Sequence, residues 1–210
     1  LQNRLETFVN KETDLVFDIL DNCECEEKIK NVSIINSLNR LDNWSDTSFE
    51  ILRKYNSLLY EGDIHYYDLK KLYKKIYLLD QQYSINLFFN YLNTRIEEVD
   101  DHDKKELVNH DWYEIFEFLL EQKEINILQR LLESIQKISN KFKNEYSKKE
   151  FLITDKVFDS IMWQFDDLHN SSWGLYRKTL DKVSQLAVDD KESFLKLTQP
   201  YQDTHYLSLI

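Results

Sequence analysis

The sequence predicts an all-α protein, and three features of its composition support this. Its 210 residues include two glycines, one proline and one alanine. Sharp turns and strand ends depend on glycine and proline, so a turn-rich β fold lacks its usual residues. Apolar residues recur three and four positions apart along most of the chain, which is the helical period. With 42% apolar and 14% aromatic residues, we expect about nine or ten amphipathic helices around a sizeable core.

Five helices are expected in the first half, over 15–20, 29–38, 49–59, 69–79 and 83–92. They are separated by an acidic turn near 24–27, a polar loop at 42–46, Gly62 and a break at 80–82. Thr47 and Glu50 have the spacing of a capping box at the start of the third helix. The residues expected to face inward are Leu15, Val16, Ile19, Leu20, Ile29, Val32, Ile35, Leu38, Phe49, Leu52, Tyr55, Leu59, Leu69, Leu72, Tyr73, Ile76, Leu79, Tyr83, Leu87, Phe88, Tyr91 and Leu92.

Five further helices are expected over 112–119, 128–142, 157–168, 173–186 and 194–197, the last ending before Pro200. Asp111 and Glu114 again have capping-box spacing. The segment 128–142 is the most regular, since its apolar residues alternate three and four apart and suit an antiparallel neighbour. Because burying a Leu or Phe side chain is worth roughly 1.5–3 kcal/mol, we expect packing, more than local propensity, to hold these helices.

A short aromatic pattern suggests how the helices are arranged. Phenylalanines beside carboxylates or apolar residues recur in steps of 32, 39, 28 and 42 residues, at Phe17, Phe49, Phe88, Phe116 and Phe158. These steps match helix-pair repeats. We therefore predict an irregular α-solenoid or stacked helical hairpins, with a compact irregular helical bundle as the alternative. The prediction takes 1–210 as a single domain and a fragment of a longer protein; a sub-boundary, if there is one, falls near 98–110.

The charge balance narrows the classes of partner. Lys and Arg number 27 against 38 Asp and Glu, a net charge of −11, which disfavours nucleic-acid backbones and anionic membranes. No apolar run is long enough for a membrane span, and no signal peptide is visible. Cys23 and Cys25 are too close for an ordinary disulfide framework, and the glutamates beside them disfavour reactive thiolates. We expect a cytoplasmic protein.

The sharpest chemical candidate is a stripe of imidazoles and carboxylates between the fifth and sixth helices. Residues four apart lie on one helix face, as metal ligands must. A stride of four nevertheless drifts by about 40° per step, and a cap at Asp111 would break the helix there. A solvated acidic surface is the favoured interpretation, so no metal and no cofactor is predicted. The stripe comprises Glu98, His102, Glu106, His110 and Glu114.

Two family resemblances overlap this region. His65, the His102-Asp103 pair and the Asp166-Asp167 pair occur in the order used by HD-type phosphohydrolases. That resemblance implies a metal that activates water. Arg95 followed by His102 resembles the Arg-x(4–6)-His element of HEPN ribonucleases, which implies RNA cleavage by a helical dimer. Both resemblances would centre an enzyme on Arg95, His102 and His110.

Tyrosines and lysines concentrate in the middle of the chain. Tyrosine is favoured at protein interfaces, although buried stripe positions account for some of these residues. Lysines on helix faces could contact RNA phosphates, yet they are more simply solvated. The tyrosines are Tyr55, Tyr60, Tyr66, Tyr67, Tyr73, Tyr77, Tyr83 and Tyr91; the lysines are Lys70, Lys71, Lys74 and Lys75 in one group and Lys137, Lys141, Lys143, Lys148 and Lys149 in the other.

No nucleophile motif, phosphate loop or dinucleotide fingerprint is present, so no catalytic residue is assigned and we lean toward a non-enzymatic role. The sequence favours a protein–protein interaction or scaffold module that presents an extended helical surface. The partner expected is another protein, and a basic one given the acidic balance. The alternatives are a metal-dependent phosphohydrolase or HEPN-like ribonuclease and, second, RNA binding through the lysine-rich faces.

Overall fold

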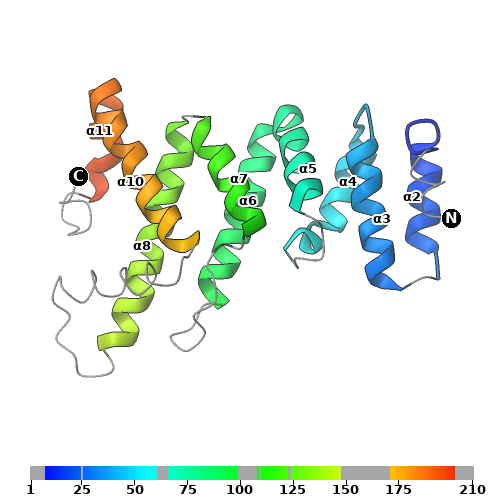
Figure 1. Cartoon of the computed structure of the whole chain (residues 1–210), viewed down its shortest axis with the longest axis horizontal. Helices are drawn as coiled ribbons and strands as arrows, with labels where there is room; N and C mark the ends of the chain where they lie inside the picture. Colours follow the sequence, from blue (N-terminus) through cyan, green and yellow to red (C-terminus); the bar gives the residue numbers. More distant parts are fainter. Residues whose placement is uncertain are drawn as a thin grey trace. The chain divides into compact units, whose positions relative to one another are not determined.

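The described part of the chain is all-helical, as predicted. A computed structural model describes residues 8–24, 26–60, 66–98, 108, 110–122, 124–147 and 171–201. These residues form nine α-helices and two short 3-10 helices, and none of them is in a strand (Figure 1). No helix among them is both long and apolar enough to cross a bilayer.

The helices follow the expected order, and most are longer than the apolar stripes that predicted them. The helix expected over 157–168 lies outside the described residues. The α-helices are α2 (Thr13–Asn22), α3 (Glu27–Arg40), α4 (Asp46–Lys54), α5 (Tyr66–Leu79), α6 (Gln81–Glu98), α7 (His110–Glu121), α8 (Ile125–Ser147), α10 (Ser171–Asp189) and α11 (Lys191–Thr198); the 3-10 helices are η1 (Asn56–Leu59) and η2 (Gln199–Tyr201).

The chain divides into two compact units, Leu1–Ser84 and Ile85–Ile210. The division falls inside α6, so the first residues of that helix belong to the first unit. Most of the segment 98–110 lies outside the described residues. The single-domain prediction and its sub-boundary near 98–110 therefore stay predictions.

In the first unit, α3 lies between α2 and α5 and packs against both (Figure 1). Tyr73 of α5 is buried, and its hydroxyl donates to the carbonyl oxygen of Ser84 at 2.6 Å. This bond satisfies a buried phenol and ties α5 to the first turn of α6. The buried apolar side chains of this unit are Val9, Val16, Phe17, Leu20, Ile34, Ile35, Leu38, Leu41, Leu52, Leu59, Leu69, Leu72, Tyr73 and Ile76.

In the second unit, α6 and α8 run parallel in a fixed register. Arg130 Nη1 donates to Asn86 Oδ1 at 2.8 Å, and Lys137 Nζ donates to Asn93 Oδ1 at 3.0 Å. Lys141 Nζ donates to the carbonyl oxygen of Glu97 at 2.8 Å. All three pairs are 44 residues apart, and a constant difference along two helices requires them to point the same way.

Aromatic rings from α6 and α7 form the centre of the second unit. Tyr91 stacks on Trp112 with ring centroids 4.2 Å apart and planes at 11°. Phe88 lies 6.2 Å from Trp112 and 6.4 Å from Phe116. All four side chains are buried. Such pairs add about 0.5–1.5 kcal/mol to the free energy of burial itself, so this stack holds α6 against α7.

Helices α10 and α11 are the last described α-helices of the second unit. Helix α10 packs against α7, α8 and α11. Lys178 of α10 pairs with Glu117 of α7, and its ammonium lies over the ring of Tyr113. The buried hydroxyl of Thr179 donates to the carbonyl oxygen of Leu175 at 2.6 Å, so it needs no partner outside its own helix.

The predicted capping box of α4 was wrong, because the helix begins earlier than expected. The N-cap of α4 is Ser45, which forms a capping box with Ser48 in place of Thr47 with Glu50. Helix α7 begins at His110, so Asp111 lies in its first turn and does not precede it. Asp80, predicted to interrupt the chain, does separate α5 from α6, and its carboxylate accepts from the Tyr83 amide at 2.9 Å.

Some residues expected to face inward are exposed. Leu15 and Ile19 of α2 lie on the surface, and Phe17 is buried in their place. Ile29 and Leu79, at the ends of their helices, are also exposed. A spacing of three and four identifies an apolar face, but it does not say which edge of a wide face meets a neighbouring helix.

The aromatic stack of the second unit generates a stability prediction. We expect Trp112→Ala to lower the free energy of unfolding by about 3–5 kcal/mol, because the indole is only 1% exposed and its loss leaves a cavity beside Tyr91. Val188→Ala is the control, since that side chain is 86% exposed and should change stability by less than about 0.5 kcal/mol. Urea unfolding followed by circular dichroism measures both; equal effects would contradict the core assignment.

Candidate functional site

The candidate stripe of imidazoles and carboxylates does not lie on one continuous helix. Helix α6 ends at Glu98, α7 begins at His110, and Val108 between them is not helical. His102 and Glu106 lie outside the described residues. Within the residues that are described, no group of three or more His, Cys, Asp or Glu side chains could hold a metal ion. Val108 interrupts the helix on which the five residues would share a face, and metal binding by His102, Glu106 and His110 stays untested.

The residues behind the two family resemblances are mostly outside the description as well. His65, His102, Asp103, Asp166 and Asp167 are not described. Arg95 is described, and its Nη1 pairs with Glu98 Oε2 at 2.9 Å within α6. That contact gives Arg95 a local structural role, and the enzyme hypotheses centred on Arg95, His102 and His110 stay untested.

Cys23 takes part in a disulfide bond. The close spacing of the two cysteines argues against an ordinary disulfide framework, and the glutamates beside them predict unreactive thiols. Cys25, the other cysteine, lies outside the described residues. Close spacing argues against a disulfide framework across the fold, but it does not exclude a local bond.

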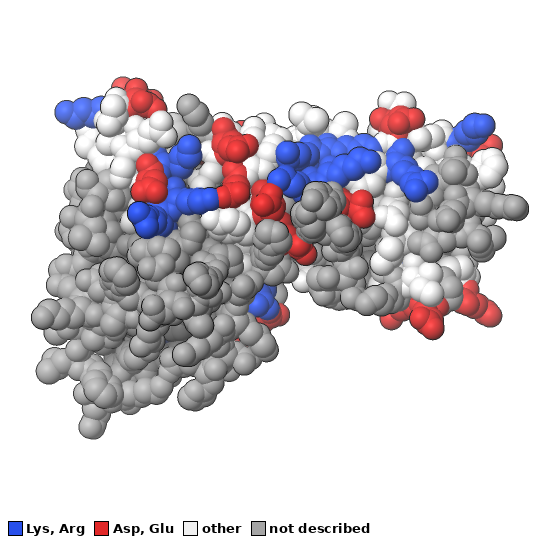
Figure 2. Space-filling model, viewed as in Figure 1, with Lys and Arg blue, Asp and Glu red and all other residues white. Residues whose placement is uncertain are grey.

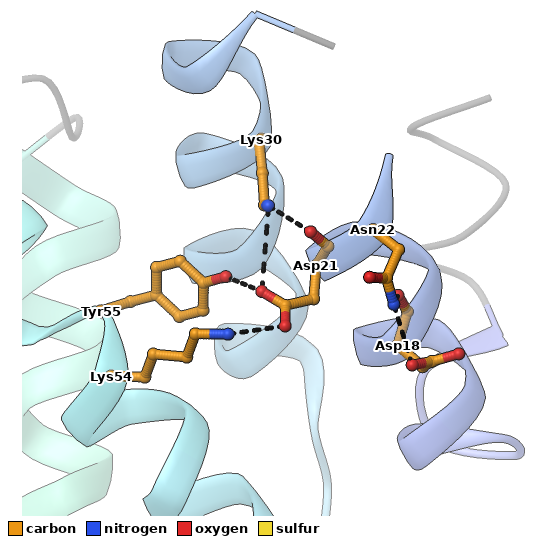
Figure 3. A network of polar contacts seen from close by, with 6 residues as sticks. All are labelled: Asp18, Asp21, Asn22, Lys30, Lys54 and Tyr55. Carbon is orange, nitrogen blue, oxygen red and sulfur yellow. Dashed lines mark hydrogen bonds and ion pairs between the residues drawn. The ribbon is translucent and has the colours of Figure 1, made fainter. Parts of the chain in front are cut away.

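A polar cluster around Asp21 ties three helices of the first unit together (Figure 3). The Asp21 carboxylate at the end of α2 accepts a hydrogen bond from Tyr55 and one from Lys54 Nζ at 2.6 Å. Lys30 of α3 donates to the Asp21 carbonyl oxygen, and its Nζ lies 3.8 Å from the carboxylate. One aspartate thus links α2 to α3 and to the end of α4.

The electrostatics of this cluster suit structure better than catalysis. Hydrogen bonds from Lys54 and Tyr55, then the charges of Lys54 and Lys30, hold the pKa of Asp21 below its usual value despite some burial. Burial, followed by the bond to Asp21, raises the pKa of Tyr55 far above its usual value. The aspartate is thereby a weaker base and the tyrosine a weaker acid, the reverse of what general acid–base chemistry requires.

A second grouping in the first unit is made of aromatic rings and cations. The ring centroids of Trp44 and Phe49 are 5.1 Å apart, and those of Phe49 and Tyr83 are 6.1 Å apart, both in edge-to-face geometry. The Arg53 guanidinium lies 5.7 Å from the Tyr83 ring centre, and Lys75 Nζ lies 5.9 Å from the Trp44 ring centre. We call these five residues the aromatic cluster.

Local structure explains how the aromatic cluster is assembled. Trp44 lies in the loop before the Ser45 cap, so the start of α4 fixes its position beside Phe49. Phe49 and Arg53 are four residues apart and share one face of α4. Tyr83 follows Asp80, whose carboxylate holds the Tyr83 amide. Lys75 comes from α5, and its Nζ donates to the carbonyl oxygen of Asn39 at 3.4 Å.

Two polar atoms of the aromatic cluster lack a partner. Trp44 Nε1 and the Tyr83 hydroxyl are buried atoms of half-buried side chains, and neither finds a hydrogen-bond partner in the described structure. A buried donor without a partner costs roughly 1–3 kcal/mol. Each such group therefore needs an explanation.

Burial also shifts the titration of groups in and beside the cluster. Burial, then the nearby charge of Lys71, lowers the pKa of Lys75, against a smaller opposing effect of Asp42. Burial raises the pKa of Tyr60 to about 12, with the proximity of Tyr83 adding to it. Burial likewise raises the pKa of Tyr83, although Arg53 opposes this. Both phenols stay protonated. Keeping Lys75 charged in its partly dry position costs the folded state free energy.

Only some of the tyrosines and lysines predicted to form interaction surfaces are available on the surface. Tyr73 and Tyr91 are buried, and Tyr55 belongs to the Asp21 cluster. The side chains of Tyr66 and Tyr67 are not described. Figure 2 shows Lys and Arg side chains gathered over α4 and α5 of the first unit. In the second lysine group, Lys137 and Lys141 bind α6, as described above.

Sequence reasoning did not single out Trp44 or Arg53. The available signal was a tryptophan inside an otherwise polar loop at 42–46, followed by an aromatic residue and a cation on one helix face. Comparison of this chain with protein-family models, curated proteins and solved structures found no match.

The Asp21 cluster predicts a pH dependence of stability. The folded-state pKa of Asp21 lies below its usual 3.8, so its contribution is complete above that value and is lost as the pH falls through the folded pKa. Because the carboxylate is 37% exposed, we expect no more than about 1 kcal/mol. Urea unfolding between about pH 2 and 6 should show a smaller rise in stability for Asp21→Asn than for the wild type. Asp14→Asn, also on α2, is the control and should retain the wild-type rise.

The position of Lys75 predicts a stabilising substitution. Below its lowered pKa the folded state keeps a charged ammonium in a partly dry place, and this cost disappears as the pH rises above the usual value of 10.5. We expect Lys75→Met to raise the free energy of unfolding by up to about 1 kcal/mol at neutral pH, with a gain that shrinks toward pH 10.5. The exposed Lys74→Met variant is the control. A loss of stability at neutral pH would show that the contacts of Lys75 outweigh its burial.

Proposed function

We propose that this chain is a protein–protein interaction module and that the aromatic cluster of the first unit is its docking site. One observation carries the proposal: a half-buried Trp and a half-buried Tyr each have an unpartnered polar atom and a cation beside the ring. Trp, Tyr and Arg are the residues that most often dominate binding energy at protein interfaces. Lys75 adds a charge that costs stability in the free chain.

The chemistry of the cluster defines the segment it would bind. Trp44 Nε1 is a donor only, and the Tyr83 hydroxyl can donate. Arg53 and Lys75 favour negative charge. A segment with carbonyl or carboxylate oxygens and an apolar side chain would satisfy all four groups. This local preference differs from the basic partner expected from the overall charge of −11, so a basic partner would have to bind elsewhere on the chain.

The helical arrangement supports a role as a scaffold. In each unit, helices that are not consecutive pack together: α3 with α5, and α8 with α10. Together with the parallel register of α6 and α8, this is the packing expected of stacked helical hairpins. We propose that arrangement over a compact bundle, because stacking leaves long helix faces open for partners. The cytoplasmic location stays a prediction.

The alternatives have less support. The phosphohydrolase and HEPN-like hypotheses rest on His102, which the structure does not describe. RNA binding rests on the lysine groups, of which Lys137 and Lys141 already bind α6. RNA affinity that falls steeply with salt would favour that alternative.

Two conservative substitutions test the proposed docking site. Trp44→Phe removes the indole N–H and keeps an aromatic ring, whereas Arg53→Gln removes an exposed charge. After affinity capture from the native cells and reconstitution with the purified partner, we expect each to weaken binding about tenfold. Arg177→Gln, an exposed arginine of α10, is the matched control.

Two results would contradict the proposal. One is an affinity that is the same for wild type, Trp44→Phe and Arg53→Gln. The other is stoichiometric metal in the purified protein that is lost in both His102→Ala and His110→Ala, which would favour the enzyme alternative.

A further inference from the structure

Helix α2 carries an apolar stripe on its solvent side. Leu15 is 54% exposed and Ile19 is 37% exposed, and these residues are four apart, so they lie one turn above the other. Phe8, ahead of α2 in the sequence, and Ile29, in the first turn of α3, are exposed as well. Four of the nine exposed large apolar side chains of the described structure thus fall within 8–29.

The opposite side of α2 explains why this stripe faces outward. Val16, Phe17 and Leu20 are buried, and the helix packs against α3. Successive residues turn by about 100°, which places Leu15 on the far side of α2 from that buried face and Ile19 at its flank. Helix α3 covers only the buried face of α2. The stripe of Leu15 and Ile19 therefore has no described helix packed against it.

Acidic side chains border the stripe. Asp14 and Asp18 are exposed and four residues apart, and they form a row beside the row of Leu15 and Ile19. Asp18 Oδ1 accepts from Asn22 Nδ2 at 3.0 Å, which continues the polar edge toward the end of α2. Glu12, also exposed, precedes the helix. Lys11 is the exposed cation nearest this face in sequence.

We propose that the outer face of α2, formed by Leu15 and Ile19 beside Asp14 and Asp18, docks an amphipathic helix whose apolar stripe is flanked by lysine or arginine. Apolar side chains at i and i+4 are the spacing that a partner helix reads in this binding mode. The carboxylates speed its approach and fix its orientation. This is the basic partner that the net charge of the chain favours.

Charge argues against a second copy of this chain as the occupant. Two α2 faces brought together would place the rows of Asp14 and Asp18 close to each other in a partly dry interface, and like charges in contact are costly. A basic helix would instead place lysine or arginine beside the carboxylates of Asp14 and Asp18 and neutralise their charge. The small apolar area of the stripe indicates a weak, transient complex, so the face suits reversible binding.

This surface is independent of the aromatic cluster. It lies on a different helix and carries the opposite charge, so failure of one proposal leaves the other intact. A variant that separates them is Arg53→Gln, which should bind a basic helix as the wild type does.

A synthetic helical peptide with leucine on one face and lysine on both flanks is the probe, and fluorescence anisotropy measures its affinity. We expect the double variant Leu15→Ser, Ile19→Ser to bind about tenfold more weakly than the wild type. We expect Asp14→Asn, Asp18→Asn to weaken binding and to flatten its dependence on salt. All four side chains are exposed, and circular dichroism verifies that the variants keep their helices.

Matched controls come from the same unit. Leu78→Ser removes a leucine that is 85% exposed, and Glu50→Gln removes an exposed charge of α4; neither should change the affinity. The proposal is overturned if the lysine peptide does not bind, if a glutamate-flanked version binds equally well, or if the α2 variants bind like the wild type. Self-association that sedimentation detects in the wild type and not in Leu15→Ser, Ile19→Ser would identify a second copy as the occupant and would equally overturn it.

Discussion

Burial of bulky apolar side chains between helices is the constraint on which this structure depends. The chain has almost no alanine or glycine to bring helix backbones close together, so its helices meet through rings and branched side chains. The stack of Phe88, Tyr91, Trp112 and Phe116 shows the consequence. Large rings bury much surface per residue, which compensates for the many residues of modest helix propensity.

Polar contacts in the described structure set the register between helices. Asp21 joins three helices of the first unit, and the contacts of Arg130, Lys137 and Lys141 align α6 with α8 in the second. Each is partly exposed, so each adds little to stability. Their contribution is to specificity. Hydrogen bonds are directional, so they fix which turn of one helix lies beside which turn of its neighbour, whereas apolar contacts do not.

The two proposed surfaces have opposite charge and share one physical origin. At the aromatic cluster, polar atoms are buried without partners; on α2, apolar side chains are exposed without partners. The first departs from the rule that buried polar groups are hydrogen-bonded, and the second is a small exposed apolar patch of the kind that can mark an interaction site. The proposed partners would remove these costs by pairing the polar atoms and covering the apolar side chains.

Composition and apolar spacing by themselves determined the helical class, the order of the helices and most buried positions, including Leu69, Leu72, Tyr73 and Ile76 of α5. Helix starts were less predictable, since Ser45 and Thr47 are equally plausible caps until the neighbours of α4 are known. Only the tertiary structure placed Leu15 and Ile19 outside and brought Trp44, Tyr83 and Lys75 together. The physical reason is the distance along the sequence over which each property is set. Apolar periodicity shows which residues share a face of one helix, whereas exposure and clustering depend on side chains tens of residues away.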